Sequence, residues 1–329
     1  MCIALVSTSH PSYSLIVIDN RDEFLRRPTS SLEWWPEPNG HVLASRDLAR
    51  AVHGTWMGVT RQGKVAVLTN YREDTADAVS GMRSRGVIVN SWLATPADGS
   101  GTTREFAEEM IASQTFSGVG GFSLVFGRVN EPLAVVSNRS SQIENVDWIA
   151  TEKKQTVGLS NTAFDDRSWP KILDGERLME EAIASHVAAG ENEEDLIQRL
   201  LAVLCTDTLP RMPEGSGLET YLPHLRKSIF IPVIGHTDRQ PVPALDKEGA
   251  EERLKAASQP DAALDPAYIQ GAYGTQKQTV VLVTDQGRVR YFERTLYDQQ
   301  VNPVPQGEGD TSVEFTVEPP PSNPDEGSS

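Results

Sequence analysis

Several residue patterns that mark whole classes of protein are missing from this sequence. Its 329 residues contain two cysteines, Cys2 and Cys205, which are too few for a disulfide scaffold. No apolar run approaches the roughly eighteen residues of a membrane-spanning helix. The first residues also lack the basic region and long apolar stretch of a targeting peptide. We therefore expect a soluble, intracellular protein with no transmembrane segment.

Positive charge is scarce as well. Lysine and arginine together number 30 against 46 aspartates and glutamates, which gives a formal net charge of −16. Nucleic acids and anionic membranes attract basic surfaces, so this balance argues against both as partners and predicts no nucleic acid ligand.

The sequence has no motif for a bound metal or nucleotide. The six histidines are scattered without the spacing of a zinc site: His10, His41, His53, His186, His224 and His236. No glycine-rich phosphate loop follows a predicted strand, and no Cys-x-x-Cys-His motif attaches haem covalently. We predict no metal site and no required cofactor. Reversible binding of haem as cargo, through the Cys2 thiolate or a histidine, stays open.

Hydrophobic patterning predicts an α+β protein with strands at both ends of the chain. Residues 2–6 and 13–18 have the pattern of two buried strands joined by a turn. Further strands are predicted at residues 55–60, 65–69, 122–126, 133–137, 155–159, 228–233, 279–284 and 288–295. Helices are predicted at residues 86–94, 102–112, 169–187 and 193–204, with Thr102 and Glu105 as a capping box.

The same patterning suggests one domain with an acidic tail. Residues 1–300 form the predicted domain, and residues 235–265, where charge and proline alternate without periodicity, form a surface insertion. Residues 301–329 contain no lysine or arginine, include Pro319, Pro320 and Pro321, and are expected to be disordered at their end.

Cys2 is the most informative single residue. A methionine followed by a small residue is normally removed, which would leave a first residue carrying both a thiol and a free amine. The amine titrates near pH ~8 and the thiol near ~8.5, so the amine can accept the thiol proton near neutral pH. The alternative is that Cys2 is simply a small buried residue of the first strand.

A polar cluster follows the apolar part of the second predicted strand, at residues 19–23, Asp-Asn-Arg-Asp-Glu. The hairpin brings this cluster near the chain start, where Arg21 can hold a carboxylate or steady a thiolate and Asp22 can orient an amine. The alternative is a strand end followed by a helix cap at Asp22.

Two asparagines also follow apolar strands, Asn70 and Asn161. The side-chain amide of asparagine is a neutral donor suited to an oxyanion hole, although asparagine is also common in turns. Trp56 lies between two glycines, and we expect Trp56 and Tyr71 to form the wall of a ligand cleft.

At this point the sequence resembles a known family. Asn20-Arg21-Asp22-Glu23, together with Met1-Cys2-Ile3, Gly158-Leu159-Ser160-Asn161, Trp169-Pro170-Lys171 and Tyr273-Gly274-Thr275, looks like the NRDE family over nearly the whole folded chain. That family resembles the N-terminal nucleophile hydrolases, in particular the bile-salt and penicillin V amidase branch. The resemblance implies a four-layer αββα sandwich of two antiparallel sheets flanked by helices.

The resemblance also implies roles for individual residues. Cys2 would be the nucleophile, with Asn20, Arg21 and Asp22 near the Arg-Asn-x-Asp segment of that branch. The register is imperfect, because the arginine of the branch falls on Asp19. Asn161 would be the oxyanion asparagine and Asn70 a second amide. A late arginine of the family is replaced here by Gln276, so its contact is either lost or moved to Lys277.

Two functions from different classes follow as expectations. The first is an N-terminal cysteine hydrolase acting on a non-peptide amide or thioester. The second is a non-catalytic carrier that holds haem or an acyl-coenzyme A in the same cleft. Family associations imply Golgi organisation and protein secretion, haem trafficking, and lipid metabolism. They suggest secretory-pathway proteins as partners and a cytoplasmic location, with the Golgi or the mitochondrion as alternatives.

Overall fold

Two antiparallel sheets form the centre of the molecule. The computed structural model describes residues 1–70, 84–95, 101–113, 119–235 and 268–318. The first sheet has the strand order β10 (Thr156–Ser160), β1 (Ile3–Ser7), β2 (Leu15–Phe24), β11 (Tyr273–Val283), β12 (Arg288–Thr295) and β13 (Asp310–Thr316). The second has the order β3 (Glu33–Trp34), β4 (Val42–Ala44), β5 (Met57–Thr60), β6 (Lys64–Asn70), β7 (Phe122–Arg128), β8 (Leu133–Ser137) and β9 (Asp147–Ile149).

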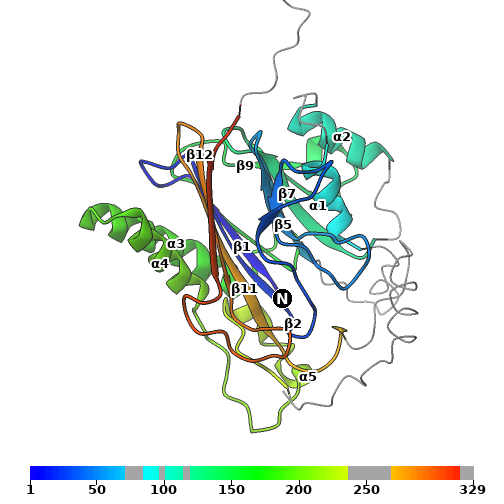
Figure 1. The fold of residues 1–329 in the computed structure, drawn as a ribbon, viewed down its shortest axis with the longest axis vertical. Helices are drawn as coiled ribbons and strands as arrows, with labels where there is room; N and C mark the ends of the chain where they lie inside the picture. The colour runs from blue at the N-terminus through cyan, green and yellow to red at the C-terminus, as the bar shows by residue number, and fades with distance from the viewer. Residues whose placement is uncertain (71–83, 96–100, 114–118, 236–267, 319–329) are drawn as a thin grey trace, which may run out of the picture.

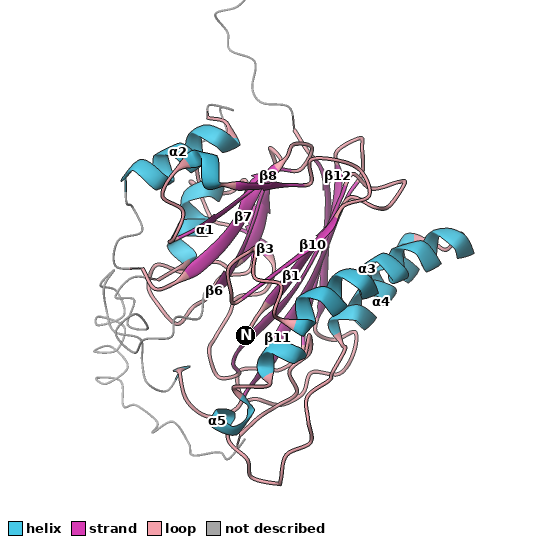
Figure 2. Cartoon of the chain, turned by 180° about the vertical axis from the view of Figure 1, so that it is seen from behind, coloured by secondary structure: helices cyan, strands magenta, loops and turns pink. Residues whose placement is uncertain are grey.

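Helices cover the outer face of each sheet. The pair α3 (Pro170–Ala189) and α4 (Glu193–Leu204) lies on the first sheet, and α1 (Gly86–Leu93) with α2 (Thr103–Ser113) lies on the second (Figures 1 and 2). A short helix, α5 (Leu218–Tyr221), and two 3-10 turns, η2 (Ile143–Asn145) and η3 (Leu225–Lys227), complete the elements. The predicted α+β architecture of two antiparallel sheets flanked by helices is confirmed.

Three apolar clusters pack the two sheets and the two helical layers together. The alternating directions of the side chains along β2 show how. Leu15 and Val17 point to the space between the sheets, whereas Ile16 and Ile18 point to α3 and α4. A third cluster packs the second sheet against α1 and α2. Because successive side chains of a strand face opposite sides and both faces of the first sheet are covered, residues 15–18 of β2 are all apolar and buried.

The four predicted helices are confirmed to within two residues at each end. Thr102 and Glu105 form the expected capping box, each side chain bonded to the backbone nitrogen of the other at 3.1 and 2.7 Å. A hairpin turn joins β11 to β12, and Gly287 in this turn has a positive φ of 78°.

Some strand boundaries differ from the prediction, and the strand predicted at residues 279–284 begins at Tyr273. The second strand continues through the polar cluster to Phe24, which removes both the predicted strand end and the alternative helix cap. Residues 228–233 form no named strand. The backbone nitrogen of Phe230 bonds to Thr206, and the carbonyl of Ile231 accepts from Thr275.

The folded part also extends beyond residue 300, where the sequence suggested that the domain ends. Every residue of strand β13 pairs with β12, and Val313 and Phe315 pack against the apolar cluster between the sheets. The predicted insertion at 235–265 falls almost entirely outside the described residues, as does the disorder expected at the chain end. Among the helices that the structure describes, none is long and apolar enough to cross a membrane.

Candidate active site

Cys2 lies immediately before β1, in the middle of the first sheet. Strand β1 pairs with β10 on one side and β2 on the other, with Ile3 opposite Ser160 and Asn20. Continuing this antiparallel register by one residue places Cys2 between Asn161 and Arg21. The sheet therefore brings together three residues that are far apart in the sequence.

The sulfur of Cys2 contacts the backbone of Asp22. The backbone nitrogen of Asp22 donates to Sγ at 3.4 Å, and Sγ lies 3.7 Å from the carbonyl oxygen of the same residue. Burial raises the pKa of the thiol to about 11, and the carboxylates of Asp22 and Asp19 act in the same direction, whereas the terminal amine opposes them. With Met1 in place the thiol is therefore protonated at neutral pH.

The terminal amine of Met1 lies against the carboxylate of Asp22. Its nitrogen is 3.4 Å from Oδ2 of Asp22 and donates to the hydroxyl of Tyr273. Oδ1 of Asp22 accepts from the hydroxyl of Thr275 at 2.7 Å. The carboxylate of Asp22 thus pairs with the amine of Met1 on one side and with Thr275 on the other.

Arg21 points into the space between the sheets and is held on three sides. One guanidinium nitrogen donates to Gln276 and the other to Asp47 at 2.9 Å, and the guanidinium carbon lies 4.7 Å from the ring centre of Trp56. Asp47 also accepts from Arg27 at 2.6 Å. Burial would raise the pKa of Asp47, but the two arginines lower it further than burial raises it.

Gln276 lies at an irregularity in the sheet. In the ladder between β2 and β11, Thr275 is opposite Asp22 and Lys277 is opposite Arg21, so Gln276 is an additional residue. Its side-chain oxygen accepts from Arg21, and its side-chain nitrogen donates to two backbone carbonyls. It therefore holds the arginine of the neighbouring strand.

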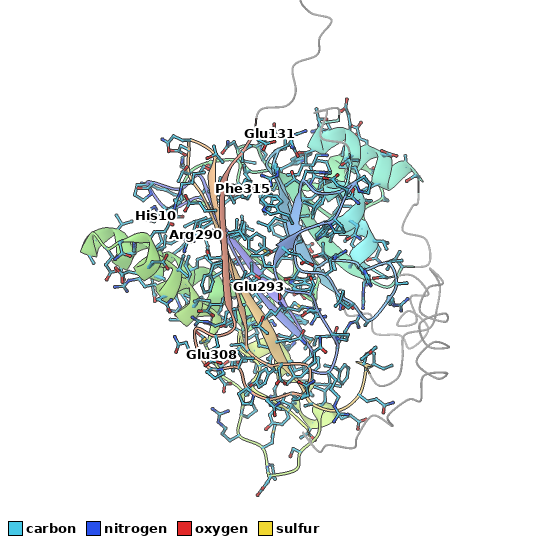
Figure 3. All side chains as sticks on the ribbon, in the orientation of Figure 1. His10, Glu131, Arg290, Glu293, Glu308 and Phe315 are labelled. Carbon is cyan, nitrogen blue, oxygen red and sulfur yellow. The ribbon has the colours of Figure 1, made fainter. Side chains whose placement is uncertain are left out.

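Lys277 does not supply the missing cationic contact. Its side chain is buried, and its ammonium is 2.6 Å from Oε1 of Glu293, which also accepts from Ser45 at 2.7 Å. Figure 3 shows Glu293 on β12 in the middle of the molecule. The positive charge of Lys277 is thus paired inside the space between the sheets.

Asn20 lies apart from the other predicted site residues. Its side-chain nitrogen donates to the carbonyls of Leu204 at 2.8 Å and Ile229 at 2.9 Å, and Gln278 donates to its oxygen at 3.3 Å. Asn20 therefore joins β2 to the end of α4 on the face opposite Arg21. Its side-chain amide nitrogen is therefore engaged by backbone carbonyls, and a catalytic role for Asn20 stays a prediction.

The two predicted oxyanion asparagines lie at strand ends that meet. Asn161 is buried, and its side-chain oxygen has no hydrogen-bond partner among the described residues. Asn70 ends β6 in the second sheet, and the preceding Thr69 donates its hydroxyl to the carbonyl of Ser160 at 2.8 Å. Trp56 faces Arg21, as a cleft wall would, whereas Tyr71 lies outside the described residues.

Sequence reasoning missed two charged residues close to the sulfur. Both carboxylate oxygens of Asp19 are buried without a hydrogen-bond partner, and burial, together with Asp22, raises its pKa well above the usual value. Lys171, on α3, is fully buried, and its ammonium donates to the carbonyl of Met1 at 2.5 Å. Both residues are in quoted motifs, but nothing in a sequence shows that side chains from a strand and a distant helix converge.

The histidines that the structure places give no metal centre. Within the described part of the chain, no group of three histidine, cysteine, aspartate or glutamate side chains is arranged to hold a metal ion. His10 and His186 instead bond to each other, with 3.1 Å between their ring nitrogens.

Comparison with known proteins identifies the family. A family model described as Transport and Golgi organisation 2 matches residues 1–298. The chain belongs to the Transport and Golgi organisation 2 family. This confirms the resemblance carried by the NRDE motif. The human Transport and Golgi organization protein 2 homolog is 27% identical over 303 residues, which cover 89% of this chain and 91% of the relative.

Solved structures similar to this member of the Transport and Golgi organisation 2 family include two hydrolases. One is the N-acylethanolamine-hydrolyzing acid amidase ortholog of Caenorhabditis elegans, with a TM-score of 0.42 and 11% identity over 60% of this chain and 85% of that one. The other is a variant of the conjugated bile acid hydrolase of Clostridium perfringens, with a TM-score of 0.35 and 10% identity over 97% of each chain.

Proposed function

We propose that the Cys2 site hydrolyses a non-peptide amide or a thioester once Met1 has been removed. One observation carries the proposal: the sulfur of Cys2, the amine at the start of the chain and the carboxylate of Asp22 converge at one point. Nucleophile, proton acceptor and orienting carboxylate are the parts that an activated thiol requires. In this scheme Cys2 itself supplies the first two.

The chemistry then follows from the proposed groups. The amine of Cys2 takes the thiol proton, Sγ attacks the acyl carbon, and the carbonyl electron pair moves onto oxygen. Side-chain amides of Asn161 and Asn70 are the proposed donors to that oxygen, and one such donor contributes about 10²- to 10³-fold in rate. The tetrahedral intermediate expels the leaving group, which takes the proton from the amine, and water hydrolyses the resulting thioester.

Arg21 acts in this proposal as a positioning residue. Its guanidinium is held by Asp47, Gln276 and Trp56, so it has little freedom to move with a substrate. It fixes the strand on which Asp22 lies and contributes a positive charge beside Cys2, which favours the thiolate over the thiol.

The decisive experiment compares two forms of the chain. Both carry Cys205→Ser, because Cys205 is exposed and would also react. One form is expressed with excess methionine aminopeptidase and the other as a Met1-retaining chain, and intact mass establishes the N-terminus of each. A cysteine-reactive acyl probe should label the trimmed chain at Cys2 and turn over. Failure of a chain that begins with Cys2 to react would contradict the proposal.

A second function is favoured by the high thiol pKa in the chain that keeps Met1. A protonated, half-buried thiol is a poor nucleophile, so that form suits a carrier that holds an acyl-coenzyme A or haem as cargo. Titration with palmitoyl-coenzyme A and, separately, with haemin tests this function. Carrier activity requires saturable binding that survives Cys2→Ala, whereas absence of saturation with both ligands would contradict it.

The cellular setting is proposed from the relatives, which are described as transport and Golgi organization proteins. We infer a cytoplasmic protein that acts with secretory-pathway proteins in Golgi organisation and protein secretion, with haem trafficking, lipid metabolism and a mitochondrial association as alternatives. Secretion rate and Golgi morphology after deletion of the gene, with rescue by wild type and by Cys2→Ala, test whether that role needs the site.

A further inference from the structure

Lys171 is a buried lysine that lacks a carboxylate partner among the described residues. It is the second residue of α3 and has no solvent exposure. Its ammonium donates to the backbone carbonyl of Met1 at 2.5 Å. A buried charge is normally paired, because leaving one without hydrogen bonds costs several kcal/mol.

The position of this ammonium is set by its acceptor. The carbonyl of Met1 belongs to the peptide bond that joins Met1 to Cys2, so Lys171 lies next to the nucleophile. Burial lowers the pKa of Lys171, while Asp22, Cys2 and Asp19 oppose that shift and favour the charged form. The side-chain nitrogen of Lys171 thus lies against the peptide group that precedes Cys2, and α3 covers the outer face of the first sheet (Figure 2).

Removal of Met1 takes away the carbonyl oxygen that Lys171 holds. In the trimmed chain a buried ammonium then lacks its hydrogen-bond acceptor at the point where an acyl group must meet Cys2. Two groups of an acyl substrate could accept the hydrogen bond from the Lys171 ammonium. One is the carbonyl oxygen, which becomes negative in the transition state, and the other is the carboxylate produced by hydrolysis. Both are oxygen acceptors like the carbonyl that has left.

We propose that Lys171 is a further catalytic residue, which binds the carbonyl oxygen of an acyl substrate in the place left by the carbonyl of Met1. When Sγ of Cys2 bonds to the acyl carbon, the π electron pair moves onto that oxygen and the ammonium of Lys171 stabilises the charge. The pair returns as the bond to the leaving group breaks, so Lys171 keeps its protons throughout. This inference rests on the proposed hydrolase function.

A stability measurement tests the inference without any turnover. In the chain that retains Met1, Lys171→Met removes a satisfied hydrogen bond, and we expect the melting temperature to fall. In the trimmed chain the same variant removes an unsatisfied buried charge, and we expect it to rise. Lys153→Met is the matched control, because Lys153 is exposed, and should have the same small effect in both forms. A fall of equal size in both forms would overturn the inference.

Ligand binding gives a second readout on the same proteins. Acetate, a carboxylate product, should raise the melting temperature of the trimmed wild type but not of its Lys171→Met variant or of the chain that retains Met1. Equal stabilisation of trimmed wild type and variant would contradict the inference.

Reaction rates separate this inference from the proposed function. In the trimmed chain we expect Lys171→Met to slow acylation of Cys2 by a simple acyl thioester about 10²-fold relative to methyl methanethiosulfonate. Both reagents react with the thiolate, but only the thioester forms an oxyanion, so their ratio cancels a change in thiol pKa. An unchanged ratio contradicts the role of Lys171 alone, whereas failure of trimmed wild type to be acylated contradicts the proposed function.

Discussion

Oδ2 of Asp22 lies 3.4 Å from the terminal nitrogen of Met1, so a carboxylate inside β2 is the counter-ion of the start of the chain. The Asp22 side chain has no exposed surface, and its other oxygen is occupied by Thr275. A buried carboxylate with one oxygen reserved for an amine is costly unless the amine is there. This contact couples the position of the N-terminus to the interior of the first sheet.

Asp22→Asn should separate the charge of Asp22 from its shape. The amide can keep the hydrogen bond from Thr275 but cannot pair with the amine, so we expect a loss of about 1 to 3 kcal/mol in the free energy of unfolding. Labelling of Cys2 in the trimmed chain should slow as well, because its amine is no longer oriented. Urea unfolding and intact-mass labelling measure the two effects. Asp174→Asn, on the exposed side of α3, is the control.

The titration of Cys2 should depend on whether Met1 is present. In the Met1-retaining chain, the thiol has a pKa of about 11, so its reaction with a neutral thiol reagent should rise with pH up to and beyond 10. In the trimmed chain the amine is on Cys2 itself and the partly buried Met1 is gone, so half-maximal reactivity should occur at a lower pH. Rates measured in the Cys205→Ser background test this. Identical profiles for both chains would contradict the assigned role of the amine.

The sequence predicts the position of a site residue when strand pairing fixes it, and does not when the position depends on a contact with a distant element. Cys2, Arg21, Asp22 and Asn161 were predicted beside one another because the β1 and β2 hairpin and the motifs fix their register. Lys171 was not among the predicted site residues, and the direction in which the Asn20 side chain points was not predicted.

The face that Asn20 presents depends on strand β2 continuing past Ile18. The apolar pattern stops at that residue, but hydrogen bonds to distant segments hold Asp22, through Thr275, and Arg21, through Asp47. Those bonds are tertiary and have no local signature.

Asp19 should make the protein less stable as the pH rises. Its pKa is raised in the folded state, so between the usual value near ~4 and that raised value the folded chain binds a proton that the unfolded chain has lost. The protonated Asp19 carboxyl therefore contributes to the free energy of unfolding at low pH, and this contribution declines as the pH rises across that window. Asp19→Asn is neutral at every pH, and its unfolding free energy relative to wild type should increase as the pH rises. Parallel stability curves would show that Asp19 is ionised in the native protein.

The His10 and His186 pair should have the opposite pH dependence. The Nε2 atom of His10 bonds to Nδ1 of His186, and its own Nδ1 accepts from the backbone of Ser12, which leaves no site for another proton. Burial, and then the charge of His186, lowers the pKa of His10 to about 4. Below pH ~6.5 the imidazole of His10 takes up a proton in the unfolded chain but not in the folded chain. Stability therefore falls as the pH drops from 6.5 towards 4.

Substitution of His10 tests this dependence. His10→Gln should remove most of the acid-induced loss, which amounts to at most about 3 kcal/mol. Chemical unfolding between pH 4 and 7 measures the difference, and His41→Gln, outside the pair, is the control. Figure 3 shows His10 beside the helical layer, so hydrogen exchange should locate the acid-sensitive region at α3. Wild-type acid sensitivity in His10→Gln would show that other groups cause it.

The predicted elements agree with the structure where buried apolar residues recur regularly along a helix or strand. The prediction missed the edge strand β13. Strand β13 has alternating apolar residues, Val313 and Phe315, in a segment without lysine or arginine that the composition assigned to a tail outside the domain. Its order comes from β12, whose edge it pairs with along its whole length. Residues 228–233 show the reverse error. Their apolar run predicted a strand, but the run packs on the core without pairing in a sheet.

The buried pair of Lys277 and Glu293 provides the last test, since it separates charge pairing from packing. Removing one partner, as in Glu293→Gln, leaves the ammonium of Lys277 without its carboxylate and should lower the free energy of unfolding by about 3 to 5 kcal/mol. The double variant Lys277→Met with Glu293→Leu removes both charges and should be close to wild type, because an apolar pair of similar volume fills the space between the sheets without desolvating ions. Equal losses in the single and double variants would instead mean that Ser45 and the other polar neighbours of Glu293 require the carboxylate itself. Denaturant unfolding of the three proteins measures this directly.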